Sequence, residues 1–374
     1  MRWMFWLSAV TVVYAYLGYP VWLWLRSWWS PRPVLRGSGL PMVSAVMVVR
    51  NEESSIARKL GNLLTLEYPA EKLEVVVVSD GSSDGTEAAL AEFERRDPRV
   101  RLLAKRPSKG KAAGLNDAIA LARGEVLLFT DARQQIEPSA LRFLIENFGD
   151  SQVGVASGEL MLGDPASGET AKGMGLYWRI EKRIRELESA SGSVAGATGA
   201  LYCARRCLLD PLPEGTILDD VLLPMQVIRR GSRVIFDSRA RAWDSPDLGD
   251  SREFSRKVRT LSGNYQLLQL APWLLSSSNA IRFEFISHKL SRLIVPFALL
   301  GLLLASIFLP GAFYRVALGA QLAFYVLSLA SLGGIKVGPL SRLADAARTF
   351  VVLNSAALMA FVNFVTGRKT IWVR

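Results

Sequence analysis

The sequence has few of the side chains on which hydrolytic triads and transition-metal sites depend. Its 374 residues contain one histidine, His288, and two cysteines, Cys203 and Cys207. A single histidine excludes a zincin or any other multi-histidine metal site, and a Ser-His-Asp triad has no cluster of partners here. The cysteines are too few for a disulfide framework or a metal, so we interpret them as reduced packing residues. Any catalysis is therefore expected to depend on carboxylates.

Glycine-rich nucleotide motifs are also missing. Neither GxGxxG nor GxxxxGK followed by Ser or Thr occurs, so the sequence supports neither a dinucleotide site nor a P-loop. The formal net charge of +11 is compatible with nucleic-acid binding, but no aromatic-rich RNA-binding signature accompanies it. In a membrane protein, excess Lys and Arg marks cytoplasmic loops near anionic headgroups. We therefore expect membrane lipids, and no nucleic acid, as partners.

Half of the residues are hydrophobic, yet 21% are charged, which indicates a soluble domain joined to a membrane portion. Residues 3–25 carry no charge and are long enough to cross a bilayer, so residues 1–30 are predicted to form a transmembrane helix. A cleaved signal peptide is disfavoured because the stretch is long and lacks a small-residue cleavage site. Arg26, Arg32 and Arg36 follow the helix, which predicts a cytoplasmic location for the next segment and a multi-pass protein of the inner (plasma) membrane.

The rest of the chain divides by pattern into three regions. Residues 40–248 alternate strand-like apolar runs with helix-like stretches, which predicts an α/β domain with a mainly parallel sheet and a ligand at the carboxyl ends of its strands. Residues 249–292 combine apolar and basic side chains at helical spacing, as expected of amphipathic helices on the membrane surface. Residues 293–374 hold three further apolar segments. How many of them cross the membrane, and on which side the chain ends, stays open.

Four short segments carry the polar residues of this domain. They are VMVVRNEE at 46–53, VVVVSDGSSDGT at 75–86, KGKAAGLNDAIALARG at 109–124 and LLFTDARQ at 127–134. Each one alone is compatible with an ordinary turn between a strand and a helix. In their order and spacing, however, they resemble the family 2 inverting glycosyltransferases.

The resemblance covers roughly residues 40–290 and is to the membrane-embedded branch of the family, which includes cellulose, hyaluronan and poly-N-acetylglucosamine synthases and ceramide glucosyltransferases. It implies a GT-A fold, which is a Rossmann-like nucleotide-sugar-binding domain, here with transmembrane helices at both ends. It also implies a membrane-bound hexosyltransferase that uses a nucleotide-diphosphate sugar, with UDP as the expected nucleotide. The acceptor is expected to be a growing polysaccharide or another membrane-associated glycan.

The same resemblance assigns the donor-binding residues. The positions that match Asn51, Glu52 and Asp80 lie around the nucleoside in the family, and those that match Lys109 and Lys111 approach the uracil or the diphosphate. Positive side chains are also what a diphosphate requires on physical grounds.

Family members usually carry an Asp-x-Asp motif that holds Mg²⁺ or Mn²⁺ against the diphosphate. This chain has Asp131, Ala132 and Arg133 at those positions. Asp131 is therefore the predicted metal ligand, since phosphate oxygens and water can complete the shell of a hard divalent cation. Two alternatives remain: Arg133 could replace part of the metal's charge, or Asp131 could only cap a turn.

The remaining predicted site residues come later in the chain. In the family an acidic pair supplies the base that deprotonates the acceptor hydroxyl, and its last member matches Asp220, with Asp219 as its neighbour. The alternative is an ordinary acidic helix start. Arg259 matches the arginine of a Gln-x-x-Arg-Trp segment and is a candidate ligand of the diphosphate. Thr260 replaces the tryptophan, which weakens the case for long-chain polymerisation.

The sequence therefore predicts an inverting, metal-dependent transferase with Asp220 as base. Transfer of a single sugar to a lipid is the main alternative, because three downstream apolar segments are few for a polysaccharide channel. The other alternative is a catalytically inactive scaffold that binds a nucleotide sugar and has partners in an export complex. A soluble-type sugar nucleotidyltransferase is disfavoured because it gives no reason for the membrane helices.

Overall fold

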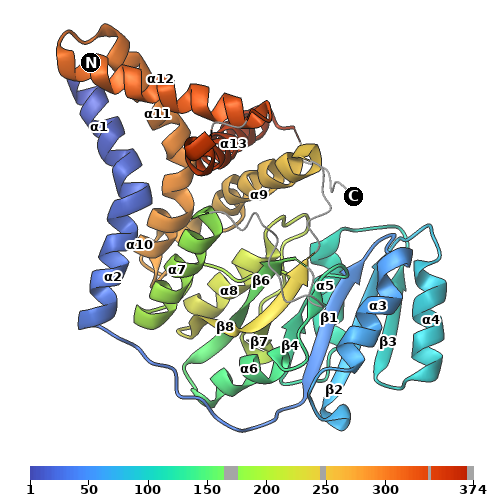
Figure 1. The fold of residues 1–374 in the computed structure, drawn as a ribbon. Helices are drawn as coiled ribbons and strands as arrows, with labels where there is room; N and C mark the ends of the chain where they lie inside the picture. Colours follow the sequence, from blue (N-terminus) through green and yellow to red (C-terminus); the bar gives the residue numbers. More distant parts are fainter. Residues whose placement is uncertain (164–175, 245–249, 336–337, 369–374) are drawn as a thin grey trace.

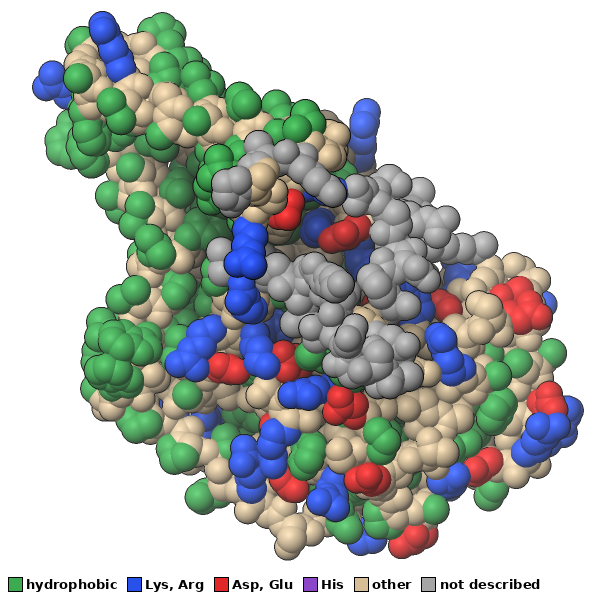
Figure 2. All heavy atoms as spheres, in the orientation of Figure 1, with side chains coloured by type: hydrophobic (Ala, Val, Ile, Leu, Met, Phe, Trp, Pro, Cys, Tyr) green, Lys and Arg blue, Asp and Glu red, His purple; other side chains and the backbone are tan. Residues whose placement is uncertain are grey.

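The structure is a computed structural model that describes residues 1–163, 176–244, 250–335 and 338–368, without the side chains of residues 176–177, 250–252 and 339. A sheet domain lies beneath a group of long apolar helices (Figure 1). Hydrophobic side chains cover the upper helices, whereas acidic and basic side chains are spread over the sheet domain (Figure 2). This distribution is what a membrane portion joined to a water-exposed domain requires.

One eight-stranded sheet forms the centre of the lower domain, with the strand order β3-β2-β1-β4-β7-β6-β8-β5. The first four strands in this order are parallel to one another, and β7 runs antiparallel to both of its neighbours. β6 and β8 pair in parallel, and the short β5 is antiparallel at the edge. The strands are β1 (Val43–Val49), β2 (Leu73–Asp80), β3 (Val100–Lys105), β4 (Val126–Phe129), β5 (Gln135–Ile136), β6 (Val153–Leu162), β7 (Tyr202–Arg205) and β8 (Arg233–Asp244).

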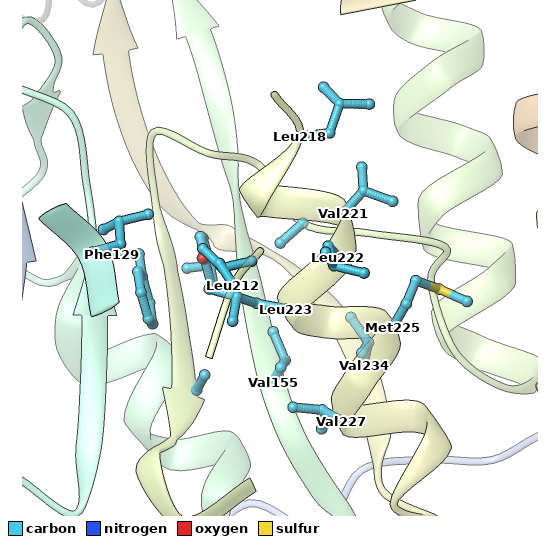
Figure 3. Close-up of a cluster of buried hydrophobic side chains, with 14 of the residues drawn as sticks. Phe129, Val155, Leu212, Leu218, Val221, Leu222, Leu223, Met225, Val227 and Val234 are labelled. Carbon is cyan, nitrogen blue, oxygen red and sulfur yellow. The ribbon is translucent and has the colours of Figure 1, made fainter. Parts of the chain in front are cut away.

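Helices cover both faces of this sheet because alternate residues of the central strands point to opposite sides. Val46 and Val48 of β1 share a buried cluster with α5 (Lys111–Leu121) and α8 (Asp219–Arg229). Met47 and Val49 pack on the other face against α3 (Glu53–Leu64), α4 (Thr86–Arg96) and α6 (Ala140–Glu146). Figure 3 shows α8 beside the sheet, where Val221, Leu222, Leu223 and Met225 belong to the same buried cluster as Phe129, Val155 and Val234.

The two cysteines differ in environment. Cys203 is buried in β7, whereas Cys207 is exposed, so the prediction of a packing role is wrong for Cys207. Both thiols are free.

Four helices among the described residues are long and apolar enough to cross a membrane: Arg2–Trp29, Arg282–Phe308, Ala312–Leu332 and Ser341–Val365. The first comprises α1 (Arg2–Val13), a π-helical turn at Tyr14–Gly18 and α2 (Tyr19–Trp29). The second comprises α10 (Arg282–Phe285), a π-helical turn at Ile286–Leu290 and α11 (Ser291–Phe308). The third and fourth are α12 (Ala312–Leu332) and α13 (Ser341–Val365). Arg282–Phe308 runs across residue 292, where the sequence predicted the end of the surface helices.

Two helices connect the membrane portion to the sheet domain. α7 (Leu176–Ser191) packs against both α2 and β8, and α9 (Asp250–Leu270) packs along α13. Tyr265 of α9 stacks on Phe364 of α13 with ring centroids 5.2 Å apart. These two helices hold the membrane portion above the carboxyl ends of the strands, where the site residues lie.

Candidate active site

The loops that follow β1 and β2 are joined to each other by hydrogen bonds. The Asn51 side-chain oxygen accepts a hydrogen bond from the Ser83 amide at 2.8 Å, and the Glu52 amide donates one to the Thr86 hydroxyl oxygen at 2.8 Å. Asn51 has a φ of 55°, a left-handed conformation that asparagine tolerates better than most residues. Asn51 and Glu52 therefore fix the shape of this edge of the sheet through their local bonds.

Asp80 ends β2 and is fully buried beneath the next loop. Its carboxylate accepts hydrogen bonds from the Ser108 hydroxyl at 2.6 Å and from the Lys109 and Gly110 amides, both at 2.8 Å. Burial alone would raise the pKa of Asp80, but these three bonds stabilise the charged form and bring the pKa below its usual value. Asp80 thus positions the loop that leads to Lys111, and the Lys109 side chain lies exposed on that loop.

Lys111, the first residue of α5, joins two acidic side chains. Its Nζ lies 3.0 Å from Asp131 Oδ1, just beyond β4, and 3.3 Å from Asp219 Oδ2, at the start of α8. Burial would lower the pKa of Lys111, but the charges of Asp131 and Asp219 outweigh it and raise the pKa. The ammonium is therefore a fixed positive charge at the meeting point of three chain segments.

Asp220 lies beside this cluster, against a glycine-containing loop. The Ala197 amide donates a hydrogen bond to the Asp220 backbone oxygen at 2.7 Å. A Cβ atom at Gly199 would lie 3.1 Å from Asp220 Oδ2, so the loop approaches the carboxylate closely. Burial and the nearby Asp219 carboxylate raise the pKa of Asp220 to about 6, and Lys111 and Lys289 partly oppose this shift. A carboxyl group with such a pKa is suited to act as a base near neutral pH.

Arg259 of α9 also belongs to this cluster. It is half-buried, and its charge interacts with those of Asp219, Asp131 and Asp220. Burial lowers the pKa of its guanidinium below the usual value. The structure therefore brings five predicted site residues together, namely Lys111, Asp131, Asp219, Asp220 and Arg259, and places Asn51, Glu52, Asp80 and Lys109 on the adjoining loops of β1 and β2.

The residues present fit a divalent cation that takes most of its ligands from elsewhere. Among the described residues, no three acidic, histidine or cysteine side chains converge as metal ligands. Asp131 offers a single carboxylate, and its side chain is 42% exposed. One carboxylate suffices for Mg²⁺ or Mn²⁺ when phosphate oxygens and water supply the other ligands.

Arg133 has a partner within the protein. Its Nη2 donates to both carboxylate oxygens of Asp244 at 3.0 and 3.1 Å, and Gln134 donates to the same carboxylate at 3.0 Å. Asp244 ends β8, so this contact fixes the loop after Asp131 to the far half of the sheet.

Sequence reasoning missed Lys59, whose side chain binds the segment that carries Asp131. Lys59 is 1% exposed, and its Nζ donates to the Thr130 hydroxyl at 2.8 Å and to the Gln134 carbonyl at 2.7 Å. The helical spacing of Ile56, Lys59, Leu60 and Leu63 places this lysine on the apolar face of α3. A lysine on the apolar face of a helix indicates that its ammonium group is buried and binds polar partners, so this contact could have been predicted from the sequence.

One hollow of the sheet domain is remote from these residues. It has a volume of about 570 Å³ and lies at the amino ends of β1 and β4, where Arg123, Val126 and Arg206 contribute to its lining. None of the predicted site residues borders it.

Part of this chain matches a known protein family. Residues 44–207 match the model of glycosyl transferase family 2. The architecture resembles the mannosyltransferase PcManGT from Pyrobaculum calidifontis, solved in complex with GDP-Man and Mn²⁺, with a TM-score of 0.75 and 22% identity over 97% of this chain and 100% of that one. The fold is therefore that of the GT-A glycosyltransferases, which confirms the fold predicted from the sequence. The match of residues 44–207 agrees with the resemblance to family 2.

Curated relatives match between about half and two thirds of this chain. A beta-monoglucosyldiacylglycerol synthase of Trichormus variabilis is 29% identical over 198 residues, which are 52% of this chain and 42% of that protein. A poly-beta-1,6-N-acetyl-D-glucosamine synthase of Staphylococcus aureus is 23% identical over 248 residues, which are 64% of this chain and 58% of that protein. The chain thus spans about half the length of the curated relatives it matches.

Proposed function

We propose that this protein is a membrane-bound inverting glycosyltransferase that moves a sugar from a nucleotide-diphosphate sugar to an acceptor at the membrane surface. The observation that carries the proposal is the cluster in which Lys111 bridges Asp131 and Asp219 beside Asp220. Lys111 and Asp131 lie inside the segment that matches family 2, and the acid pair follows that segment. It combines a base with a raised pKa and positive charge for a leaving diphosphate, which are the two requirements of a single inverting displacement.

In this reaction Asp220 accepts the proton of the acceptor hydroxyl while the oxygen attacks the anomeric carbon. The bond from that carbon to the diphosphate breaks on the opposite face, and the nucleoside diphosphate leaves. Lys111 and Arg259 stabilise the negative charge that develops on the leaving group. A divalent cation held by Asp131 would supply further positive charge to the diphosphate. Asp219 keeps the Lys111 ammonium in place.

The donor we favour carries UDP, as the family resemblance implies. GDP-mannose is the second candidate, because the structural neighbour PcManGT was solved with GDP-Man. For the acceptor we favour a lipid or a short lipid-linked glycan. One relative is named for a glycosylated diacylglycerol. Thr260 also stands where the family resemblance implies a tryptophan in chain-forming enzymes. A growing polysaccharide is the alternative that the name of the second relative supports.

For the location, we propose a multi-pass protein of the plasma membrane with the catalytic domain in the cytoplasm. Arg26 lies in the last turn of the first apolar helix, and Arg32 and Arg36 follow that helix. All three lie on the side of the sheet domain, where the positive-inside rule places the cytoplasm.

The test is nucleotide release by the purified full chain in lipid nanodiscs. UDP- and GDP-sugars are supplied one at a time with Mn²⁺, Mg²⁺ or a chelator, with and without extracted native lipid. We expect release with one donor, dependent on the cation and stimulated by lipid, with a glycolipid as product. Lipid-independent synthesis of a long glycan would favour the polysaccharide acceptor. Nucleotide-sugar binding without release under any condition would support the inactive scaffold instead.

A further inference from the structure

A buried chain of charged side chains leads from the membrane helices to the loop beside Asp220. His288, on the π-helical turn of the second apolar helix, lies between two carboxylates of α7. Its Nδ1 is 2.8 Å from Glu188 Oε1, and its Nε2 is 3.1 Å from Glu181 Oε1. Arg292 of the same apolar helix donates to Glu181 Oε2 at 2.7 Å. The first apolar helix joins through Tyr19, whose hydroxyl donates to Glu188 Oε1 at 2.6 Å.

Arg185 extends this chain to the catalytic loop. Its Nε donates to Glu181 Oε1 at 3.3 Å, and its Nη1 donates to the Thr198 hydroxyl at 2.7 Å. Thr198 lies between Ala197, whose amide binds the Asp220 backbone, and Gly199, which approaches the Asp220 carboxylate. The guanidinium is a rigid fork, so one residue fixes Glu181 and Thr198 at the same time.

The same turn of the membrane helix also places a positive charge near the acid pair. Lys289 follows His288 directly, and its charge opposes the rise in the pKa of Asp220. The hydrogen-bonded connection from the membrane helix to the loop beside Asp220 is the one through Glu181, Arg185 and Thr198.

We propose that Arg185 is a positioning residue, through which the membrane helices set the geometry of the Thr198 loop and hence the alignment of the acceptor hydroxyl with Asp220. This inference rests on the proposed transfer reaction and concerns only its acceptor side. In the proposed reaction, donor binding depends on the loops after β1, β2 and β4, and within the part of the chain that the structure describes the hydrogen bonds of Arg185 go to Glu181 and Thr198 instead. A membrane-borne acceptor reaches the site from the side of these helices, so a connection at this point couples its position to the base.

The kinetic test uses Thr198→Val, which removes the hydroxyl but keeps the shape, and Arg185→Gln, which removes the charge. We expect acceptor-dependent transfer to fall on the order of tenfold in both, since small misplacements of reacting groups cost this much or more. Donor affinity and donor hydrolysis without acceptor should stay at the wild-type level, and Thr198→Ser should restore transfer. The matched control is Lys182→Gln on the same helix, whose ammonium pairs with Glu159 at 2.8 Å and does not contact Thr198.

Transfer in Thr198→Val and Arg185→Gln equal to that in Lys182→Gln would overturn the proposal, as would a parallel loss of donor binding. A wild-type protein that transfers no sugar would refute the proposed function but leave the positioning measurable by hydrogen exchange. In that case His288→Gln should accelerate amide exchange at residues 196–201 several-fold in the full chain, while residues 108–111 keep their protection. Unchanged exchange at residues 196–201 would refute the connection itself.

Discussion

The two sides of the candidate active site are built in different ways. On the donor side, residues of neighbouring loops bind one another directly, as when Asp80 holds Ser108, Lys109 and Gly110. On the membrane side, the contacts are buried and join distant parts of the chain: Tyr19 binds Glu188, 169 positions away, and His288 contacts Glu181, 107 positions away. The proposed donor side is therefore built from neighbouring strand–loop–helix units, whereas the proposed acceptor side includes contacts that the membrane helices make.

Lys111 and the acid pair lie where the two sides meet. Lys111 follows the donor-side loop that Asp80 fixes, and Asp219 and Asp220 start the helix next to the membrane-linked loop of Thr198. If the two sides have separate tasks, then substitutions should separate donor binding from transfer.

Asp220→Asn should have the largest effect. Loss of a general base lowers turnover by about 10²–10⁴-fold, whereas the nearly isosteric amide should leave donor affinity within about twofold. Turnover and the donor dissociation constant are measured on the same preparation. Asp210→Asn is the control, because Asp210 pairs with Arg230 at the surface and lies outside the cluster. Retained turnover in Asp220→Asn would remove Asp220 as the base.

Lys111→Met should weaken binding of the nucleotide-diphosphate sugar. The substitution removes a positive charge next to the diphosphate, and charge-assisted contacts of this kind contribute roughly 1.5–3 kcal/mol, or about 10- to 100-fold in affinity. Isothermal titration calorimetry with the nucleoside diphosphate measures the change. Lys105→Met, which disrupts an ion pair with Asp117 away from the acid cluster, is the control. Equal affinities in the two variants would place the diphosphate elsewhere.

Acid should inactivate the enzyme through Asp220. The pKa of this carboxyl is raised to about 6, so below that pH it is protonated and cannot accept the acceptor's proton. The ratio kcat/KM for the acceptor should fall about tenfold per pH unit below about 6 and level off above it. Asp219 and Asp131 raise this pKa, and the positive charges of Lys111, Lys289 and Arg259 oppose it. Asp219→Asn should therefore move the acid limb to lower pH, and an unmoved limb would assign it to another group.

The difference between the two sides also explains how far the sequence could be read. Local patterns predict the parallel half of the sheet, the donor loops and the acid pair. Continuous apolar runs such as VVVV indicate buried strands, and the polar motifs lie at the ends of these strands. The bonds from Arg185 to Thr198 and from His288 to α7 could not be predicted, because nothing local distinguishes these side chains from surface charges. Lys59 is intermediate: its apolar-face position was visible, but its partners Thr130 and Gln134 were not.

Arg133 gives the smallest predicted effect and the finest test of the donor side. Asp131 and Arg133 occupy the metal-motif positions, yet Arg133 pairs with Asp244, and its side chain is 38% exposed. Partly exposed ion pairs contribute about 0–1 kcal/mol, and Gln134 continues to bind Asp244 when Arg133 is removed. Arg133→Ala should therefore change the Mn²⁺ concentration for half-maximal activity by less than about fivefold. A shift of tenfold or more would mean that Arg133 leaves Asp244 for the diphosphate when donor binds, and that the donor side rearranges more than its local bonds suggest.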